Sequence, residues 1–355
     1  MSAPKIRLPA EWEPQDAIQL TWPHKDTDWQ HLLPEVIPIY TRLVQLLTTR
    51  GHVIIGAPAN EIEPIQQRFA ALGVPEEKLH LYPVVSDDTW ARDHGPITVA
   101  EGDTLCLLDY QFNGWGEKYA FQQDNRITGE LFRQGAFPGA TLQPKTLVLE
   151  GGSIESDGEG TLLTTAACLL NPNRNPTLSR EEIEQQLCTD LGIRKINWLY
   201  HGAMEGDDTD CHIDTLARLC PNNVIVYQAC DDESDSHYAE LQQMAEELEA
   251  LTCPHGQPYQ LVPMPWPSAK YDEDGHRLPA TYANFLIFNG MVIVPTYRDT
   301  NDEAALEQMA LVFPGYDIQG LDCLPIIHQH GSLHCITMQL PKGVVTPAAQ
   351  QKQQG

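Results

Sequence analysis

The repeated alternation of helical, strand and turn segments is the feature of this sequence that most limits its fold. Apolar residues recur with a helical period at 36–49, 61–72, 125–134, 179–191, 236–251 and 302–312. A short apolar strand is predicted after each of these segments, at 52–57, 79–85, 145–149, 196–200, 259–262 and 324–328. Further strands are predicted at 105–110, 161–165, 224–228, 284–288 and 291–294. This alternation predicts an α/β fold.

Local signals support the alternation. Ser179 and Glu182 form a capping box at the start of the fourth helix, and Gly192 is a suitable C-cap. The pair Asn289-Gly290 predicts a two-residue hairpin between the last two strands. About five helix–strand units end in turns with reactive groups, and a radial arrangement would bring these turns to one central site. A doubly wound sheet gives a similar alternation, and periodicity alone does not separate the two.

The charge balance is strongly acidic, with 49 Asp and Glu residues against 22 Lys and Arg residues and a formal net charge of −27. This charge repels nucleic acid and anionic lipid and attracts cations, which favours a small cationic substrate; solubility alone is the alternative explanation. The chain of 355 residues is predicted to form a single catalytic domain over 1–345. The Ala- and Gln-rich residues 346–355 are predicted to form a flexible tail.

The sequence lacks the marks of secreted and membrane proteins. Residues 1–15 contain no apolar leader, and no run of about 18 apolar residues occurs. The nine cysteines are scattered, without a CxxC pair or zinc-site spacing. These observations favour a reduced, cytoplasmic compartment and no attachment to a membrane.

The first reactive turn leads through small and polar residues to Cys335, just before an apolar strand. A thiol at such an edge can be partly exposed, and neighbouring cationic groups favour its thiolate form. The alternative interpretation is a buried cysteine that packs as a small hydrophobic residue.

The second reactive turn, 206–214, contains His212 and Asp214. Residues two apart share one face of a strand, so both side chains are expected to point into one cleft. Histidine is the natural acid and base near neutral pH, and the carboxylate could hold a cationic group. From this turn alone, a divalent-metal site is an equal alternative.

Two further turns contribute carboxylates. In the turn 87–96, Asp93 and other acidic residues surround Trp90, which suits a flat cation, because carboxylates accept its N–H groups and the ring stacks on it. Aspartate caps around a packed tryptophan are the alternative. Glu150 stands at a strand end before two glycines, which is weak evidence alone. Together, a thiol, a histidine and three carboxylates on corresponding turns suit attack on a guanidinium carbon.

Nearly the whole chain, about residues 8–341, resembles the agmatine deiminase family, grouped with the bacterial peptidylarginine deiminases in the guanidino-modifying superfamily. The resemblance is carried by PAEWEPQ at 9–15, WARDHGP at 90–96, NGWG at 113–116, LEGGS at 149–153, NPNRNP at 171–176, DTDCHID at 208–214 and HCIT at 334–337. It implies a five-bladed α/β propeller (pentein) of ββαβ-like units around a central active site.

The resemblance also implies an activity, the hydrolytic deimination of agmatine to N-carbamoylputrescine and ammonia, in putrescine and polyamine metabolism. The implied roles are Cys335 as the nucleophile of an amidino-cysteine intermediate, His212 as general acid and base, Asp93 and Asp214 as holders of the guanidinium, Glu150 as a supporting carboxylate and Trp90 as part of the substrate pocket. Arg92 and His94 are interpreted as structural residues or as supports of the residues that contact the substrate. No metal or other cofactor is required, and the family's fold suggests a homodimer.

The sequence departs from the family pattern at two places, and these are expected to face the substrate tail. HQHGSL at 328–333 replaces a Gly-rich run with an Asn, and Cys211 stands where a Gly commonly precedes the catalytic His. Ser332 and Asp208 are therefore candidate substrate-binding residues. Arginine or peptidyl arginine is the alternative substrate, although no Arg cluster near the motifs offers a clamp for a carboxylate. A metallohydrolase and a non-catalytic guanidine- or polyamine-binding protein are the alternatives from other classes.

Overall fold

The computed structural model describes residues 6–346, which divide into two compact units. Unit 1 comprises Glu13–Gly151 and the described chain from Ile336 onward, and unit 2 comprises Ile6–Trp12 and Gly152–Cys335. Among the described residues, no helix is long and apolar enough to cross a membrane. Apart from Thr346, the predicted tail at 346–355 lies outside the described residues.

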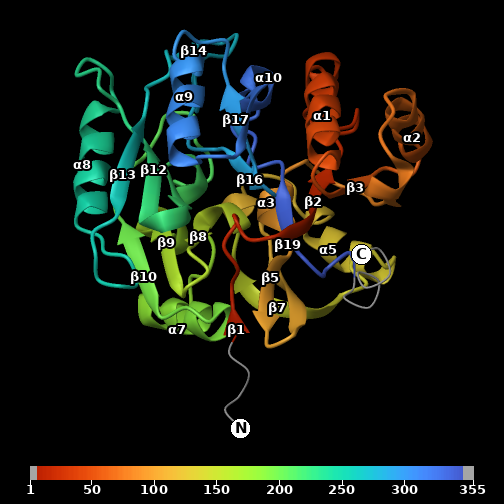
Figure 1. Cartoon of the computed structure of the whole chain (residues 1–355), viewed down its shortest axis with the longest axis horizontal. Coiled ribbons are helices and arrows are strands. Elements are labelled where there is room, and N and C mark those ends of the chain that lie inside the picture. The colour runs from red at the N-terminus through yellow and green to blue at the C-terminus, as the bar shows by residue number, and fades with distance from the viewer. Residues whose placement is uncertain (1–5, 347–355) are drawn as a thin grey trace. The chain divides into compact units, whose positions relative to one another are not determined.

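Unit 1 contains two β-sheets, which Figure 1 draws in red to yellow with the short last strand in blue. Its strands are β2 (Gln15–Thr21), β3 (His52–Ala57), β4 (Leu79–Pro83), β5 (Ile97–Glu101), β6 (Thr104–Gln111), β7 (Ala140–Val148) and β19 (Met338–Pro341). Its helices are α1 (Leu33–Thr48), α2 (Ile62–Ala71), η1 (Glu76–Lys78), α3 (Ala91–His94), α4 (Gly114–Glu117) and α5 (Asp124–Arg133). The short 3₁₀ helix η2 (Gly151–Ser153) stands where the chain passes from unit 1 to unit 2.

Unit 2 contains three three-stranded sheets and a small hairpin. Its strands are β1 (Ile6–Arg7), β8 (Ile154–Ser156), β9 (Thr161–Thr165), β10 (Lys195–Leu199), β11 (Ala217–Cys220), β12 (Val224–Gln228), β13 (Gln260–Met264), β14 (Lys270–Tyr271), β15 (Arg277–Leu278), β16 (Leu286–Phe288), β17 (Met291–Thr296) and β18 (Asp317–Asp322). Its helices are α6 (Ala166–Leu169), α7 (Arg180–Leu191), η3 (Ile213–Thr215), η4 (Pro221–Asn223), α8 (Tyr238–Glu249), α9 (Asp302–Val312) and α10 (Leu324–Ile327).

One connection pattern recurs in both units: an antiparallel strand pair, a helix and a third strand parallel to the second. In unit 2 it is formed by β8, β9, α7 and β10, by β11, β12, α8 and β13, and by β16, β17, α9 and β18. In unit 1 it is formed by β5, β6, α5 and β7, and by β19, β2, α1 and β3, which β4 extends. Figure 1 shows α9 beside β17 as an example of such a helix and strand. Each of these groups is a ββαβ-like unit, the kind of unit that the family resemblance implies.

Local sequence explains most of these elements. Strand β3 is buried along nearly its whole length, as expected for an apolar run between two parallel neighbours. Helix α7 begins at Ser179 with both hydrogen bonds of the predicted capping box, and Gly192 ends it in the left-handed conformation. Asn289 and Gly290 have φ values of 45° and 78°, as a tight hairpin between β16 and β17 requires.

The strand predicted at 324–328 is wrong. Pro325 stands at the start of α10, where a proline is tolerated because the first helical N–H groups have no partner within the helix. The strand that pairs in parallel with β17 is β18, which begins at Asp317, seven residues before the predicted start at 324. The strand predicted at 284–288 is shorter than expected, because β16 begins only at Leu286.

Candidate active site

Cys335 lies in a turn of unit 2, ahead of β19, as the sequence predicted. Its side chain is buried, and its Sγ has polar neighbours on two sides. Sγ lies 3.4 Å from Nδ2 and 3.5 Å from Oδ1 of Asn284, and 3.8 Å from Oδ2 of Asp214. A thiol used only for packing would be expected among apolar groups, so these contacts favour the reactive interpretation.

Asn284 fixes the turn that carries Cys335. Its Oδ1 accepts a hydrogen bond of 2.8 Å from the backbone N–H of His334, and its Nδ2 donates to the backbone oxygen of Asp214 at 3.2 Å. One buried amide therefore ties the turn of Cys335 to the segment of Asp214. The sequence predicted Asn284 only as part of a strand, without a role in the site.

Asp214 is fully buried, and one of its oxygens is occupied by a histidine. Nδ1 of His334 lies 2.7 Å from Oδ2 of Asp214, whereas Oδ1 has no hydrogen-bond partner among the described residues. Burial acts to raise the pKa of Asp214. The hydrogen bond from His334 and the charges of His334, His212 and Arg218 outweigh that effect and hold the pKa below its usual value. Asp214 therefore offers an ionised oxygen to a cationic group.

His212 and Asp214 belong to a 3₁₀ turn and not to a strand. His212 precedes η3, which contains Asp214, so the predicted alternation of strand faces does not apply. Polar side chains shape the loop before it: Asp207 accepts hydrogen bonds from the N–H groups of Thr209 and Cys211, and Thr209 accepts one from the N–H of His212. Such side-chain bonds compete with strand pairing and explain the turn.

A buried arginine anchors the same loop. Arg174 donates to Oδ2 of Asp210 at 2.6 Å and to the backbone oxygen of Thr209 at 2.7 Å. Asp210 and Cys211 both have φ of 67°, a conformation that costs free energy for residues other than glycine. The NPNRNP segment thus supports a strained loop that leads into His212.

The two predicted tail-binding residues lie in different surroundings. Ser332 is buried, and its hydroxyl is 2.9 Å from the hydroxyl of Tyr297, which donates to the backbone oxygen of Thr281. Asp208 is half-buried in the loop before His212. Ser332 is thus engaged in an internal hydrogen bond, whereas Asp208 keeps part of its surface exposed.

In unit 1, Asp93 lies in the short helix α3 and is buried. Its Oδ2 accepts a hydrogen bond of 3.0 Å from the indole N–H of Trp115, in the NGWG segment. Trp90 precedes α3 and packs against Trp29, with ring centroids 5.6 Å apart. Asp93 therefore accepts a hydrogen bond from one tryptophan, while Trp90 packs against another.

Glu150 follows β7 and is fully buried in unit 1. The next residue, Gly151, approaches α3 so closely that a Cβ there would lie 2.2 Å from the backbone oxygen of Arg92. Only a glycine fits at this distance. The Glu150-Gly151 segment is thereby held against the helix that contains Asp93.

Arg92 and His94 have structural contacts. Arg92 donates to Oε1 of Gln339, and Nε2 of His94 lies 3.2 Å from the hydroxyl of Thr21. Burial lowers the pKa of His94 to about 3, so the ring is neutral at physiological pH. A neutral, buried His94 agrees with the interpretation that it is not the acid and base of the reaction.

A cluster of ionic groups surrounds Arg218 in unit 2. Glu11, Glu155 and His334 lie close enough to one another to hold a metal ion, but the guanidinium of Arg218 hydrogen-bonds to both glutamates. Arg218 also donates to the backbone oxygens of Phe285 and Ala283. The positive charge that these carboxylates require is therefore supplied by the chain itself.

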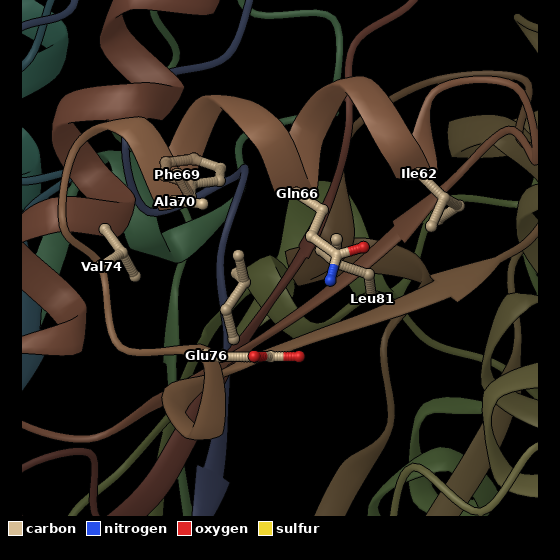
Figure 2. Close-up of a pocket in the computed structure, with 8 residues that line it drawn as sticks. Ile62, Gln66, Phe69, Ala70, Val74, Glu76 and Leu81 are labelled. Atoms are coloured by element: carbon tan, nitrogen blue, oxygen red, sulfur yellow. The ribbon is translucent and has the colours of Figure 1, made fainter.

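Unit 1 also has a cavity of about 260 Å³ between α2 and β4, which Figure 2 shows. Its walls are mostly apolar, with Ile62, Phe69, Val74 and Leu81 among the lining side chains. Glu76 is the ionisable residue among those that line it. The cavity contains none of the residues that the sequence predicted for the site.

Comparison with known proteins gives consistent matches over nearly the whole chain. The profile of the Porphyromonas-type peptidyl-arginine deiminase family matches residues 7–341. A protein of Yersinia pseudotuberculosis named "putative agmatine deiminase" is 34% identical, over 94% of this chain and 95% of its own length.

Solved structures agree with these matches. A structure described as a "putative arginine deiminase" from Porphyromonas gingivalis is 47% identical, with a TM-score of 0.89 over 96% of this chain and all of its own. A cysteine-to-serine variant of C. jejuni agmatine deiminase with substrate bound is 37% identical, with a TM-score of 0.87 over 96% of this chain and 97% of its own. An amidinotransferase from Microseira wollei, 10% identical with a TM-score of 0.52, shares the mixed α/β fold. The chain belongs to the Porphyromonas-type peptidyl-arginine deiminase family, as its sequence motifs predicted.

Proposed function

We propose that this protein hydrolyses agmatine to N-carbamoylputrescine and ammonia, with Cys335 as the nucleophile. The observation that carries the proposal is the contact of a buried thiol with an ionised carboxylate that keeps one oxygen available: Sγ of Cys335 lies 3.8 Å from Oδ2 of Asp214. A carboxylate beside a nucleophile is unfavourable for a neutral or anionic substrate, but it suits a guanidinium, whose N–H groups it accepts while the central carbon meets the thiolate.

The reaction proceeds in two steps. The thiolate of Cys335 attacks the guanidinium carbon, which Asp93 and Asp214 hold, and the tetrahedral adduct loses one nitrogen as ammonia after His212 gives it a proton. A thiouronium then links the substrate to Sγ. His212 takes a proton from water and the hydroxide attacks the same carbon. The C–S bond then breaks as the hydroxyl proton of the adduct passes to solvent, which gives the neutral ureido product and the thiolate again. Glu150 is assigned to orient the guanidinium, and Trp90 to cover its flat face.

The tail of the substrate favours agmatine over arginine. Arginine carries a carboxylate that needs a cationic partner, whereas agmatine ends in an ammonium. The arginines nearest the site motifs in sequence have other partners: Arg92 bonds Gln339, Arg174 bonds Asp210, and Arg218 bonds two glutamates. The acidic net charge also favours a dicationic substrate. Asp208 is assigned to the substrate tail, together with Ser332.

The finer predictions about the whole molecule belong to the same proposal. Five ββαβ-like units form the five-bladed propeller that the family resemblance implies, in a single catalytic domain over 1–345. The enzyme works in the cytoplasm without a metal or other cofactor, as a homodimer, on a small guanidino substrate and not on nucleic acid.

Ammonia release from agmatine, free arginine and a blocked arginine peptide, each with and without a chelator, tests the activity. Release from agmatine above the other two is the expected result. Release only from arginine or the peptide would retain the chemistry and refute the substrate, and loss of all release with chelator would favour a metallohydrolase. Binding of agmatine without ammonia release would favour a non-catalytic binding protein.

The nucleophile is tested separately. Cys335→Ala is expected to abolish ammonia release, and mass spectrometry of wild-type enzyme quenched during turnover is expected to find an amidino group on the peptide that contains Cys335. Full activity of Cys335→Ala would refute the mechanism.

A further inference from the structure

We propose that Glu11 and Arg218 are positioning residues that act through His334: they hold its ring so that Nδ1 donates to Asp214 and leaves the other oxygen of Asp214 for the substrate guanidinium. The inference rests on the proposed function of Asp214 and Cys335. Neither Glu11, Arg218 nor His334 was assigned a role from the sequence.

Both nitrogens of the His334 ring lie within hydrogen-bond distance of buried side chains. Nδ1 of His334 lies 2.7 Å from Oδ2 of Asp214, and Nε2 lies 2.8 Å from Oε2 of Glu11 and 2.9 Å from Nη2 of Arg218. If the ring carries two protons, it donates to both carboxylates. If it carries one, Nε2 accepts from Arg218 and the proton must be on Nδ1. In both cases Nδ1 carries the proton that Asp214 accepts, because a bare Nδ1 would place its lone pair against the ionised Oδ2 of Asp214 at 2.7 Å.

The two partners of Nε2, Glu11 and Arg218, are themselves held in place by further hydrogen bonds. Glu11 uses both oxygens, since Oε1 accepts from the N–H of Ile287 at 2.7 Å and Oε2 accepts from Arg218 at 2.5 Å. Arg218 is fully buried and also bonds Glu155 and the backbone oxygen of Phe285. The ring of His334 is therefore held by groups that cannot rotate without leaving a buried charge without its partner.

The position of the His334 ring affects both Asp214 and Cys335. Oδ2 of Asp214 accepts the His334 hydrogen bond and also faces Sγ of Cys335, so the same oxygen is fixed relative to the nucleophile. A displacement of about 1 Å in such a group can reduce a rate about 100-fold. His334 precedes Cys335 in the chain, so movement of its ring also disturbs the backbone of the nucleophile.

Alkylation of Cys335 by two reagents tests this inference without turnover. Chloroacetamidine is a cation that resembles a guanidinium, and chloroacetamide is its neutral counterpart. The alkylation rate with chloroacetamidine is divided by the rate with chloroacetamide, and this ratio is divided by the same ratio for free cysteine. The result, the amidine preference, measures how well the carboxylates hold a cation beside Sγ. Wild-type protein is expected to favour the amidine, and Glu11→Gln is expected to reduce that preference about 10- to 100-fold. Glutamine cannot make the same contacts as Glu11. Both carboxylate oxygens of Glu11 accept hydrogen bonds, and in glutamine one of them is replaced by an NH₂ group, which donates.

Two substitutions of His334 separate positioning from general packing. In His334→Asn the amide nitrogen takes the place of Nδ1 and can still donate to Asp214, whereas in His334→Gln it takes the place of Nε2 and the donation is lost. The amidine preference is expected to survive better in the Asn variant. In the Gln variant the pKa of Asp214 rises, because its hydrogen bond is gone while the charged and titratable groups His212, Arg218 and Cys335 remain around it. As the pH is lowered, the Gln variant should therefore lose its amidine preference at a higher pH than wild type does.

The control is Glu247→Gln, which removes the charge from another histidine–glutamate contact of unit 2, where Nδ1 of His201 lies 2.7 Å from Oε1 of Glu247. Its amidine preference should equal that of wild type. A wild-type protein without any preference would refute the proposed function itself. If wild type shows the amidine preference and Glu11→Gln retains it, the positioning role alone is refuted. Equal amidine preferences in the two His334 variants would refute it as well. The two His334 variants still test the inference if Glu11→Gln does not fold.

Discussion

Replacement of His94 should remove a large part of the acid sensitivity of this protein. His94 is buried beside Thr21, and burial lowers its pKa from 6.5 to about 3. The unfolded chain therefore binds a proton at this histidine well before the folded protein does, so the free energy of unfolding falls as the pH drops from about 6.5 toward 3. At about 1.4 kcal/mol for each pH unit, the loss between pH 7 and pH 4 is about 3 kcal/mol.

The assay compares wild type with His94→Gln, whose amide can still bond the hydroxyl of Thr21. Urea unfolding, followed by tryptophan fluorescence at pH 7, 6, 5 and 4, gives the free energy of unfolding at each pH. Many carboxylates also titrate in this range, but they are common to both proteins, so the difference in slope reports His94. The variant should lose about 3 kcal/mol less than wild type between pH 7 and pH 4.

The matched control is His255→Gln, since the side chain of His255 is 69% exposed and its pairing with Glu159 at 3.4 Å is a surface contact. Its unfolding free energy should follow that of wild type at every pH. Parallel curves for wild type and His94→Gln would refute the reasoning, because they would mean that His94 binds a proton equally well in the folded protein.

Further predictions concern the loop, the second cysteine and the close approach at α3. Cys211→Ala should retain ammonia release within a few-fold, because burial and nearby carboxylates raise the pKa of Cys211 to about 12 and keep the thiol protonated; a loss as large as that of Cys335→Ala would contradict this. Arg174→Leu should lower the free energy of unfolding in urea by about 3 kcal/mol, because it leaves Asp210 without its buried partner; a loss under about 1 kcal/mol would mean that the pair does not support the loop. Gly151→Ala should lower both the melting temperature and the ammonia release rate, because its Cβ would lie 2.2 Å from a backbone oxygen of α3; an unchanged melting temperature would show that this approach is not tight.

Elements defined by local patterns could be predicted from the sequence. Strands β3, β9 and β12 and helix α9 have the bounds that apolar runs and helical periodicity indicated. The segment 324–328 has the same apolar character as those strands, and only the place of Pro325 in the first turn of α10 distinguishes it. The recurring ββαβ pattern also needed the structure, because its parallel pairs, such as β2 with β3 and β12 with β13, join strands on either side of a helix, and β2 also pairs with β19 from the other end of the chain.

The residues proposed for the site could be selected from the sequence for a different reason. Cys335, His212 and Asp214 stand on polar turns between apolar segments, where their chemistry is unusual for the local sequence. Asn284 offers no such signal, because a single amide near an apolar strand is common. Glu11 and Arg218 are 207 positions apart, and Glu11 and His334 are 323 apart, so that only the fold brings them into contact.

Stability is a weak explanation for the cluster around Arg218. The transfer of several charges from water into a protein interior costs about as much as their attraction returns, and apolar groups of the same volume often stabilise a protein equally well. The hydrogen bonds of Arg218 and Glu11 are directional, however, and they continue through the ring of His334 to Asp214, beside Sγ of Cys335. An apolar replacement could fill the same space but could not orient that ring or choose its tautomer. The arrangement is therefore better explained by the geometry that it gives to Asp214 than by the free energy that it adds to the fold.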